Sequence, residues 1–288
     1  MTLVGLLVVF GAVIGGFAFA GGKPMVLMQI SEFIVIGGAA FGSILVANPP
    51  SILGKIVSTS MATLKGSPYT TANYLELLKM FYELFQLARR EGLLALETHI
   101  EHPHESELLS KYPAFLSEKH AVEFLADTMK VVLTGTVQPH DLLDMMDMDL
   151  ERHHEEAMIV PGVITKIADA MPGFGIIAAV LGVVLTMGAI GGPPEVIGEK
   201  VGAALVGTFL GVLLAYGVFG PLAVAMESLV SAQSQYYACI KQAILSFARG
   251  DSPMTAVEFA RRNIEPSNRP SLVEMENAVK NKKQAEAA

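Results

Sequence analysis

The chain has 288 residues and a formal net charge of −8, and 52% of its residues are hydrophobic whereas only 17% are charged. This length allows one or two domains, and the mean hydropathy of +0.48 excludes an intrinsically disordered chain. The acidic balance argues against a nucleic-acid-binding protein, and a single Cys239 excludes an intramolecular disulfide. Because the apolar residues form long runs near each end, the sequence predicts an all-α polytopic membrane protein.

Four segments are long and apolar enough to cross a bilayer, whose core needs ~20 apolar residues in one helix. The predicted spans are 3–20, 25–47, 172–190 and 201–225. Short connections with Gly and Pro follow the first and third spans, so each pair of spans forms a hairpin. We therefore predict transmembrane hairpins at 1–47 and 167–225.

The first span ends in small residues like a signal peptide, but it lacks a basic start and a second span follows at once. We therefore predict a retained helix.

Orientation follows the Lys and Arg residues beside the spans. Only Lys23 and Lys200 lie in the short loops, and the other 18 basic residues lie in 48–166 or after Pro221. We expect these longer segments and both termini to be cytoplasmic.

The polar segment 48–166 has helical periodicity and predicts a helical cytoplasmic domain. From Tyr74 to Ala88 the apolar residues recur every three to four positions, which indicates a helix with one buried face. Further helices are predicted at 117–133, after Pro139 and at 226–248. The C-terminal part, 226–288, is predicted to be a cytoplasmic helix whose polar tail, 269–288, is frayed.

No nucleophile elbow, P-loop or Rossmann glycine pattern occurs, so we predict a protein that is not an enzyme and has no catalytic residue. All seven histidines lie between residues 99 and 154. The spacing of His102, His104, His153 and His154 does not match a zinc site, so we interpret them as solvated residues and predict no metal.

Ionisable residues are absent from the two C-terminal spans, whose polar side chains are Thr186, Thr208 and Tyr216. An ionisable group near the bilayer midplane is costly and usually marks an ion path. An ion conducted here would therefore need a carboxylate from a partner. Glu32 in the second span either reaches the membrane interface or serves ion entry. Asp169 either caps a helix or takes part in ion exit.

Pro172 and Pro221 lie at the predicted cytoplasmic ends of the last two spans. Each either marks a helix boundary or acts as a hinge, because proline removes a helical hydrogen bond. Glycines are dense in all four spans, which favours close packing of helices. The same small residues would also give a smooth surface that slides against another helix.

Three segments are the most characteristic of the chain: ARREGLLALE at 88–97, ADAMPGFGIIAAVLGVV from Ala168, and VGTFLGVLLAYGVFGPLA from Val206. Shorter ones are GGKP, SEFIVIGGAAFGS, HPHESELLSKYP, VEFARR and RPS. With these segments the chain resembles the MotA family of flagellar stator subunits over nearly its whole length.

This resemblance implies a homopentamer around two copies of a single-span partner, MotB, in the lipid of the bacterial inner membrane. Ion flow at an aspartate of MotB is expected to rotate the ring, which pushes the rotor protein FliG and powers motility. The rotor-contact charges match Arg89 and Glu97, and Arg90 would share a helix face with Glu97 at about 100° per residue. Pro172 and Pro221 match prolines that couple ion flow to conformation.

The resemblance also assigns an ion path. Asp169 and Tyr216 match polar positions beside the channel, Thr208 matches a threonine that lines the ion site, and Glu32 is the candidate for ion entry. Sodium-driven relatives carry a further threonine where this chain has Ala179, and loss of a hydroxyl ligand weakens a sodium site. We therefore expect protons as the coupling ion, with sodium as the less favoured alternative and no other cofactor.

Two other functions remain open at this point. An energiser of the ExbB or TolQ kind would power outer-membrane processes, but such relatives have three spans and an external N-terminus, whereas we predict four spans. A passive membrane scaffold would show no ion dependence and would tolerate alanine at Pro172 and Pro221.

Overall fold

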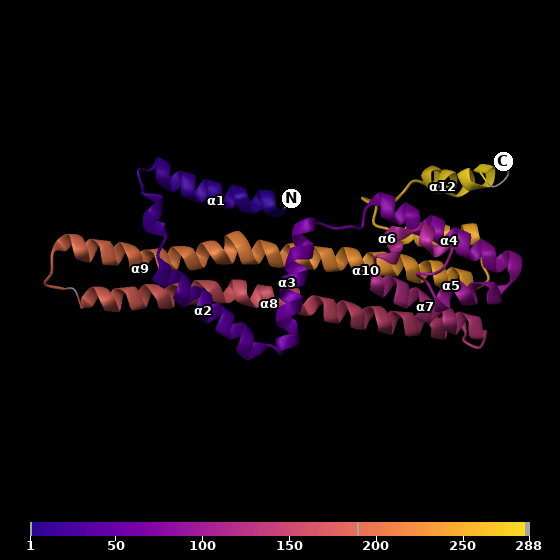
Figure 1. The fold of residues 1–288 in the computed structure, drawn as a ribbon, viewed down its shortest axis with the longest axis horizontal. Helices are drawn as coiled ribbons and strands as arrows, with labels where there is room; N and C mark the ends of the chain where they lie inside the picture. The colour runs from indigo at the N-terminus through magenta and orange to yellow at the C-terminus, as the bar shows by residue number, and fades with distance from the viewer. Residues whose placement is uncertain (1, 189, 286–288) are drawn as a thin grey trace. The chain divides into compact units, whose positions relative to one another are not determined.

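The computed structural model describes residues 2–188 and 190–285, and every regular element in these ranges is a helix. Figure 1 follows them from the indigo N-terminus to the yellow C-terminus. The chain divides into two compact units. We call them the membrane unit (Met1–Gly66 and Ala157–Leu229) and the polar unit (Ser67–Glu156 and Val230–Ala288). The predicted all-α class is confirmed.

The described part of the chain contains four helices long and apolar enough to cross a membrane, as predicted. The first hairpin consists of α1 (Thr2–Phe19), the 3₁₀ turn η1 (Pro24–Leu27) and α2 (Ile30–Ala47). The second contains the end of α8 (Pro139–Met187), α9 (Pro194–Leu214), the π-helical turn η4 (Ala215–Phe219) and the start of α10 (Gly220–Ala248). An additional helix, α3 (Pro50–Lys65), was not predicted as a separate element; it begins at a proline and ends at Gly66 with a φ of 91°.

Glycines allow α8 and α9 to meet backbone to backbone. A Cβ added to Gly211 of α9 would lie 2.7 Å from the carbonyl oxygen of Met171 and 2.8 Å from Cα of Gly175. Any larger residue would force the two helices apart, so the predicted close packing by small residues is confirmed at this crossing. In contrast, none of the residues described in α1 is buried.

The polar unit is built around α4 (Thr71–Glu91). The predicted apolar stripe is confirmed, because all of its members are buried: Tyr74, Leu77, Leu78, Phe81, Leu84, Phe85 and Ala88. Phe85 stacks on Phe247 of α10 with ring centroids 4.2 Å apart. The other elements of this unit are η2 (Leu93–Leu96), α5 (Glu97–Glu101), η3 (Leu109–Lys111), α6 (Pro113–Leu116), α7 (Lys119–Thr134), α11 (Pro253–Asn263) and α12 (Leu272–Ala285).

Three expectations about helix ends are wrong. The helix α8 runs from Pro139 to Met187 without a break, so Pro172 is not a boundary and Asp169 is not an N-terminal cap. The tail 269–288 is not frayed throughout, because it contains α12. This helix begins with reciprocal hydrogen bonds between Ser271 and Glu274, and such a capping box stabilises a helix whose composition is otherwise polar.

Candidate functional site

Glu32 lies inside the membrane unit, in the first turn of α2. The residue is 6% exposed, and its Oε2 has no hydrogen-bond partner among the described residues. A Cβ added to Gly207 of α9 would come within 2.5 Å of this oxygen. The absence of a side chain at Gly207 therefore provides the space that the carboxylate occupies. The carboxylate of Glu32 is thus covered by α9 of its own chain.

Two other candidate ion-path residues adjoin the same glycine. The backbone nitrogen of Ala179 lies 3.2 Å from the Cβ position of Gly207. Thr208 follows Gly207, and its Cα lies 3.3 Å from the Cβ position of Gly175. Both Ala179 and Thr208 are partly exposed. The fold thus brings Glu32 of α2 and the Ala178–Ala179 segment of α8 to Gly207 of α9, whereas the backbone of Thr208 meets Gly175.

The remaining candidates of the membrane unit lie more at its surface. Asp169 and Pro221 are exposed, and Tyr216 is 74% exposed within the π-helical turn. Pro172 is half-buried inside α8. Within a single chain, Asp169 and Tyr216 are therefore open to lipid or to a neighbouring molecule, whereas Glu32 is covered by its own chain.

A π-helical turn directly precedes Pro221. The proline has no N–H to donate to the carbonyl of Gly217, and its ring would clash with that carbonyl in a regular α-helix. The wider turn at Ala215–Phe219 relieves this clash and changes the helical register at this point. Pro221 thus follows a local widening of the helix, and its role as a hinge stays a prediction.

In the polar unit, Arg89 and Arg90 occupy the last turn of α4, which ends at Gly92 with a φ of 91°. Both side chains are exposed, and neither forms an ion pair within residues 2–188 and 190–285. The C-terminal end of a helix favours such positive charges. Glu97 is exposed and starts α5, so the prediction that Arg90 and Glu97 share one helix face is wrong.

Exposed apolar side chains adjoin these charges and were missed in the sequence. Leu93 and Leu94, between α4 and α5, are 42% and 75% exposed. Arg89 and Leu93 also line a surface cavity of about 430 Å³ to which Val137 and Leu142 contribute. The sequence signal for this surface was the Leu93–Leu94 pair directly after Gly92, which ends the helix. Beyond the end of the helix, these leucines do not continue its apolar stripe.

Some of the histidines interpreted as solvated are packed. His153 meets Tyr237 and His120 edge-on, with ring centroids 4.9 and 5.0 Å apart. Burial, followed by the nearby His120, lowers the pKa of His153. Nδ1 of His154 lies 2.9 Å from Oγ of Ser234. Where the structure describes the chain, no cluster of His, Cys, Asp and Glu has an arrangement that could hold a metal ion.

Comparison with known proteins places this geometry in a family. Residues 3–92 match the family described as motility protein A N-terminal, and residues 117–238 match the MotA/TolQ/ExbB proton channel family. Motility protein A of Escherichia coli strain K12 is 36% identical over 287 residues, which cover 99% of this chain and 97% of that protein. Motility protein A of Salmonella typhimurium is 35% identical over 280 residues, with coverage of 97% and 95%.

Solved structures share the fold. C. jejuni MotAB superimposes with a TM-score of 0.76 and 22% identity over 94% of this chain and 98% of that chain. The flagellar MotAB stator complex from Bacillus subtilis gives a TM-score of 0.73 and 22% identity, over 90% and 93%. The two relatives named above, at 36% and 35% identity, are motility proteins, which favours the stator over an ExbB or TolQ energiser. The chain therefore belongs to the motility protein A branch of the MotA/TolQ/ExbB proton channel family, the ion-conducting stator subunits of the bacterial flagellar motor.

Proposed function

We propose that this chain forms an ion path together with a single-span MotB-type partner, whose aspartate is the main titrating group. The observation that carries this proposal is the distribution of buried charge. Among the described residues of the membrane unit, Glu32 is the one buried ionisable side chain, and it comes from α2, not from α8 or α9. Since an intramembrane path for an ion needs titratable groups, the lack of charged residues in the spans 172–190 and 201–225 supports a carboxylate supplied from outside this chain.

Protons are the coupling ion in this proposal. Thr208 follows Gly207 in α9, and the chain has Ala179 at the position where sodium-driven relatives are expected to carry a second hydroxyl. Glu32 would take part in ion entry. One charge that crosses 100 mV releases ~2.3 kcal/mol, several times the thermal energy, which is sufficient to bias a rotational step.

The proposed assembly is a ring of five copies around two MotB-type chains in the bacterial inner membrane, in contact with lipid. Both termini and the polar unit would lie in the cytoplasm. The exposed apolar surface of α1 supports such surroundings, because it requires lipid or neighbouring chains to cover it. Asp169 and Tyr216 would face the partner, and Pro172 and Pro221 would pass its changes to the polar unit.

Arg89, Arg90 and Glu97 are proposed to contact the rotor protein FliG. The two arginines are exposed at the end of a helix and form no ion pair with described residues, so they are available to an external partner. Exposed charges steer association more than they add affinity, which suits a contact that forms and breaks at each step.

The proposal is tested by expressing the chain with a MotB-type partner whose plug has been removed. We expect a proton flux that persists without sodium. Charge reversal at Arg90 is expected to lower motor torque while the flux is unchanged. The matched control is Arg152→Glu, which changes an exposed arginine that is paired with Glu155 one helical turn away. Equal loss of flux in Arg90→Glu would contradict the contact role.

A further inference from the structure

The C-terminal segment of the polar unit flanks the end of α4 that carries Arg89 and Arg90. Both α11 and α12 pack against α4. Residues 252–254 at the start of α11 line a cavity of about 410 Å³ together with the two arginines. Val279 of α12 lines another cavity, of about 250 Å³, whose wall also includes Arg90. Arg90 therefore shares a cavity wall with each of these two helices.

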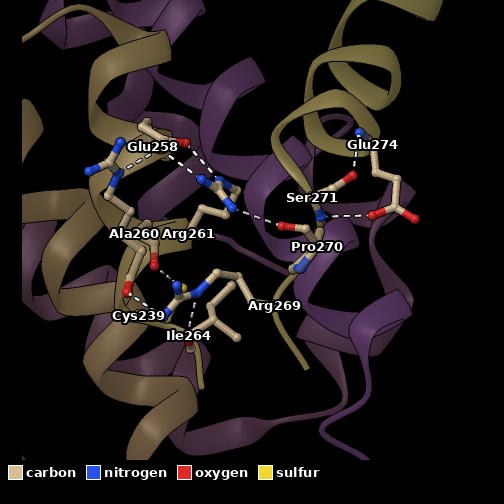
Figure 2. A network of polar contacts seen from close by, with 10 residues as sticks. Cys239, Glu258, Ala260, Arg261, Ile264, Arg269, Pro270, Ser271 and Glu274 are labelled. Atoms are coloured by element: carbon tan, nitrogen blue, oxygen red, sulfur yellow. Dashed lines mark hydrogen bonds and ion pairs between the residues drawn. The ribbon is translucent and has the colours of Figure 1, made fainter. Parts of the chain in front are cut away.

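A polar bridge links α11 to the loop that leads into α12, as Figure 2 shows. Arg261 donates from Nε and Nη2 to the carboxylate of Glu258 at 2.7 and 2.8 Å. Its third nitrogen, Nη1, donates to the carbonyl oxygen of Pro270 at 2.9 Å. The side chain of Arg261 is 12% exposed and that of Glu258 is 23% exposed, so the bridge is largely shielded from water. A planar guanidinium can make all three bonds, whereas a lysine ammonium does not match this geometry.

The loop between α11 and α12 also forms hydrogen bonds to the end of α11 through Arg269. Arg269 donates from Nε to the carbonyl of Ile264 at 2.8 Å and from Nη2 to the carbonyl of Arg262 at 3.1 Å. These bonds satisfy carbonyl groups at the end of α11 that lack helical partners. Ser271 and Glu274 then start α12 directly after the loop (Figure 2).

Few apolar side chains are buried in the first part of α12. In residues 272–279, whose burial the structure describes, they are Met275 and Val279. These two side chains remove too little apolar area from water to offset the conformational entropy lost on ordering this part of the helix. Hydrogen bonds from Arg261 lower the pKa of Glu258 to about 2, so the bridge carries full charge at neutral pH. The loop contacts therefore add to what the packing of Met275 and Val279 and the interaction of Glu276 contribute to the position of α12.

We propose that Glu258 and Arg261 are positioning residues that hold α12 on α4 through Pro270. With α12 in place, the last turn of α4 is held between α11 and α12, and Arg90 keeps the direction that the rotor contact requires. This inference rests on the contact role of Arg90 proposed above. Its structural half, the retention of α12 by Arg261, does not depend on that role.

The structural half is tested by thiol labelling of the full stator complex that carries Val279→Cys. The native Cys239 is 0% exposed and its Sγ donates to the carbonyl of Ala260 beside Arg261, so the labelling of each variant without Val279→Cys is subtracted. We expect Arg261→Met to raise the labelling rate about tenfold or more, since local opening becomes easier. The matched control is Arg262→Met, which removes a bond to the same Glu258 from a side chain that is 73% exposed and does not reach the loop. Equal rates in the two variants would overturn the proposal.

The functional half is tested by torque per stator unit at high load, proton flux and the number of units per motor. We expect Arg261→Met to lower torque per unit while flux and number stay unchanged, whereas a general folding defect would lower all three. Increased labelling with unchanged torque per unit would overturn the positioning role. Unchanged torque in Arg90→Glu would instead remove the contact role itself, and the labelling result would still decide whether Arg261 retains α12.

Discussion

The carboxylate of Glu32 on α2 and the backbone of Gly207 on α9 occupy adjoining space, because the glycine has no side chain to exclude the acid. This contact joins the first transmembrane hairpin to the second. It also places the buried acid of the membrane unit at the glycine that the backbone of Ala179 approaches and that precedes Thr208. A change at Glu32 therefore acts on the proposed ion path directly.

Replacement of Glu32 by glutamine keeps the shape of the side chain and removes its charge. We expect Glu32→Gln to lower proton flux by about tenfold without lowering the amount of complex in the membrane, because the entry step loses its titratable group. Flux is measured with an intracellular pH indicator and the amount by immunoblot. Glu195→Gln is the control, since Glu195 is an exposed acid in the first turn of α9. An equal effect of both changes would refute a specific role for Glu32.

The close approach of α8 and α9 predicts a sharp difference between two glycines of α9. Gly211→Ala would place a methyl group against the backbone of α8, and we expect a loss of about 1–3 kcal/mol in stability from overpacking. Gly198 has no atom within 4 Å of an added Cβ, so Gly198→Ala is expected to behave as wild type. The thermal midpoint of the purified complex measures both. An unchanged midpoint in Gly211→Ala would show that this crossing is looser than the structure indicates.

Substitution of Pro221 tests the π-helical turn. Alanine restores a backbone N–H that can bond to the carbonyl of Gly217, so the segment is expected to close into a regular α-helix. We expect Pro221→Ala to assemble normally and to lose most of its flux, because the widened turn and its change of register are gone. A passive scaffold predicts no change, and unaltered flux would therefore favour that alternative.

The packed histidine predicts a pH dependence of stability. Burial and then His120 lower the pKa of His153 from its ordinary 6.5, so the folded state binds this proton less readily than the unfolded state. The facing carboxylates of Asp149 and Glu156 oppose the shift without cancelling it. The contribution of neutral His153 to the free energy of unfolding is therefore fully present above pH 6.5 and is lost as the pH falls through the lowered pKa.

We expect the thermal midpoint of the complex to be lower at about pH 5.5 than at about pH 7.5. This decrease is expected to be smaller in His153→Gln. The control is His102→Gln, which changes an exposed histidine and is expected to keep the wild-type pH dependence. A midpoint that rises on acidification would show that the sign of the argument is wrong.

Elements whose burial follows a local repeat could be predicted from the sequence. The stripe on α4 and the four apolar spans are of this kind. The helix α12 could not be predicted, because its own composition is polar and its place depends on Arg261 and on the loop before it. The burial of Glu32 depends in the same way on Gly207, a residue in the other hairpin.

The candidate contact surface was predicted only in part. The charges at residues 89, 90 and 97 could be recognised, but their arrangement was inferred from one continuous helix. The positive φ of Gly92 ends that helix and leads into a 3₁₀ turn, which exposes Leu94. A glycine within a helical pattern was the available sign of this change.

The helix α4 stops at Gly92. The direction in which Arg89 and Arg90 point from the helix axis is therefore fixed by the number of residues that separate them from the buried stripe. One residue inserted after Ala88 would turn both guanidinium groups by about 100° relative to that stripe, with charge and composition almost unaltered. The length of this helix between the buried stripe and the arginines therefore matters for their direction. We expect insertions or deletions there to be tolerated less readily than substitutions.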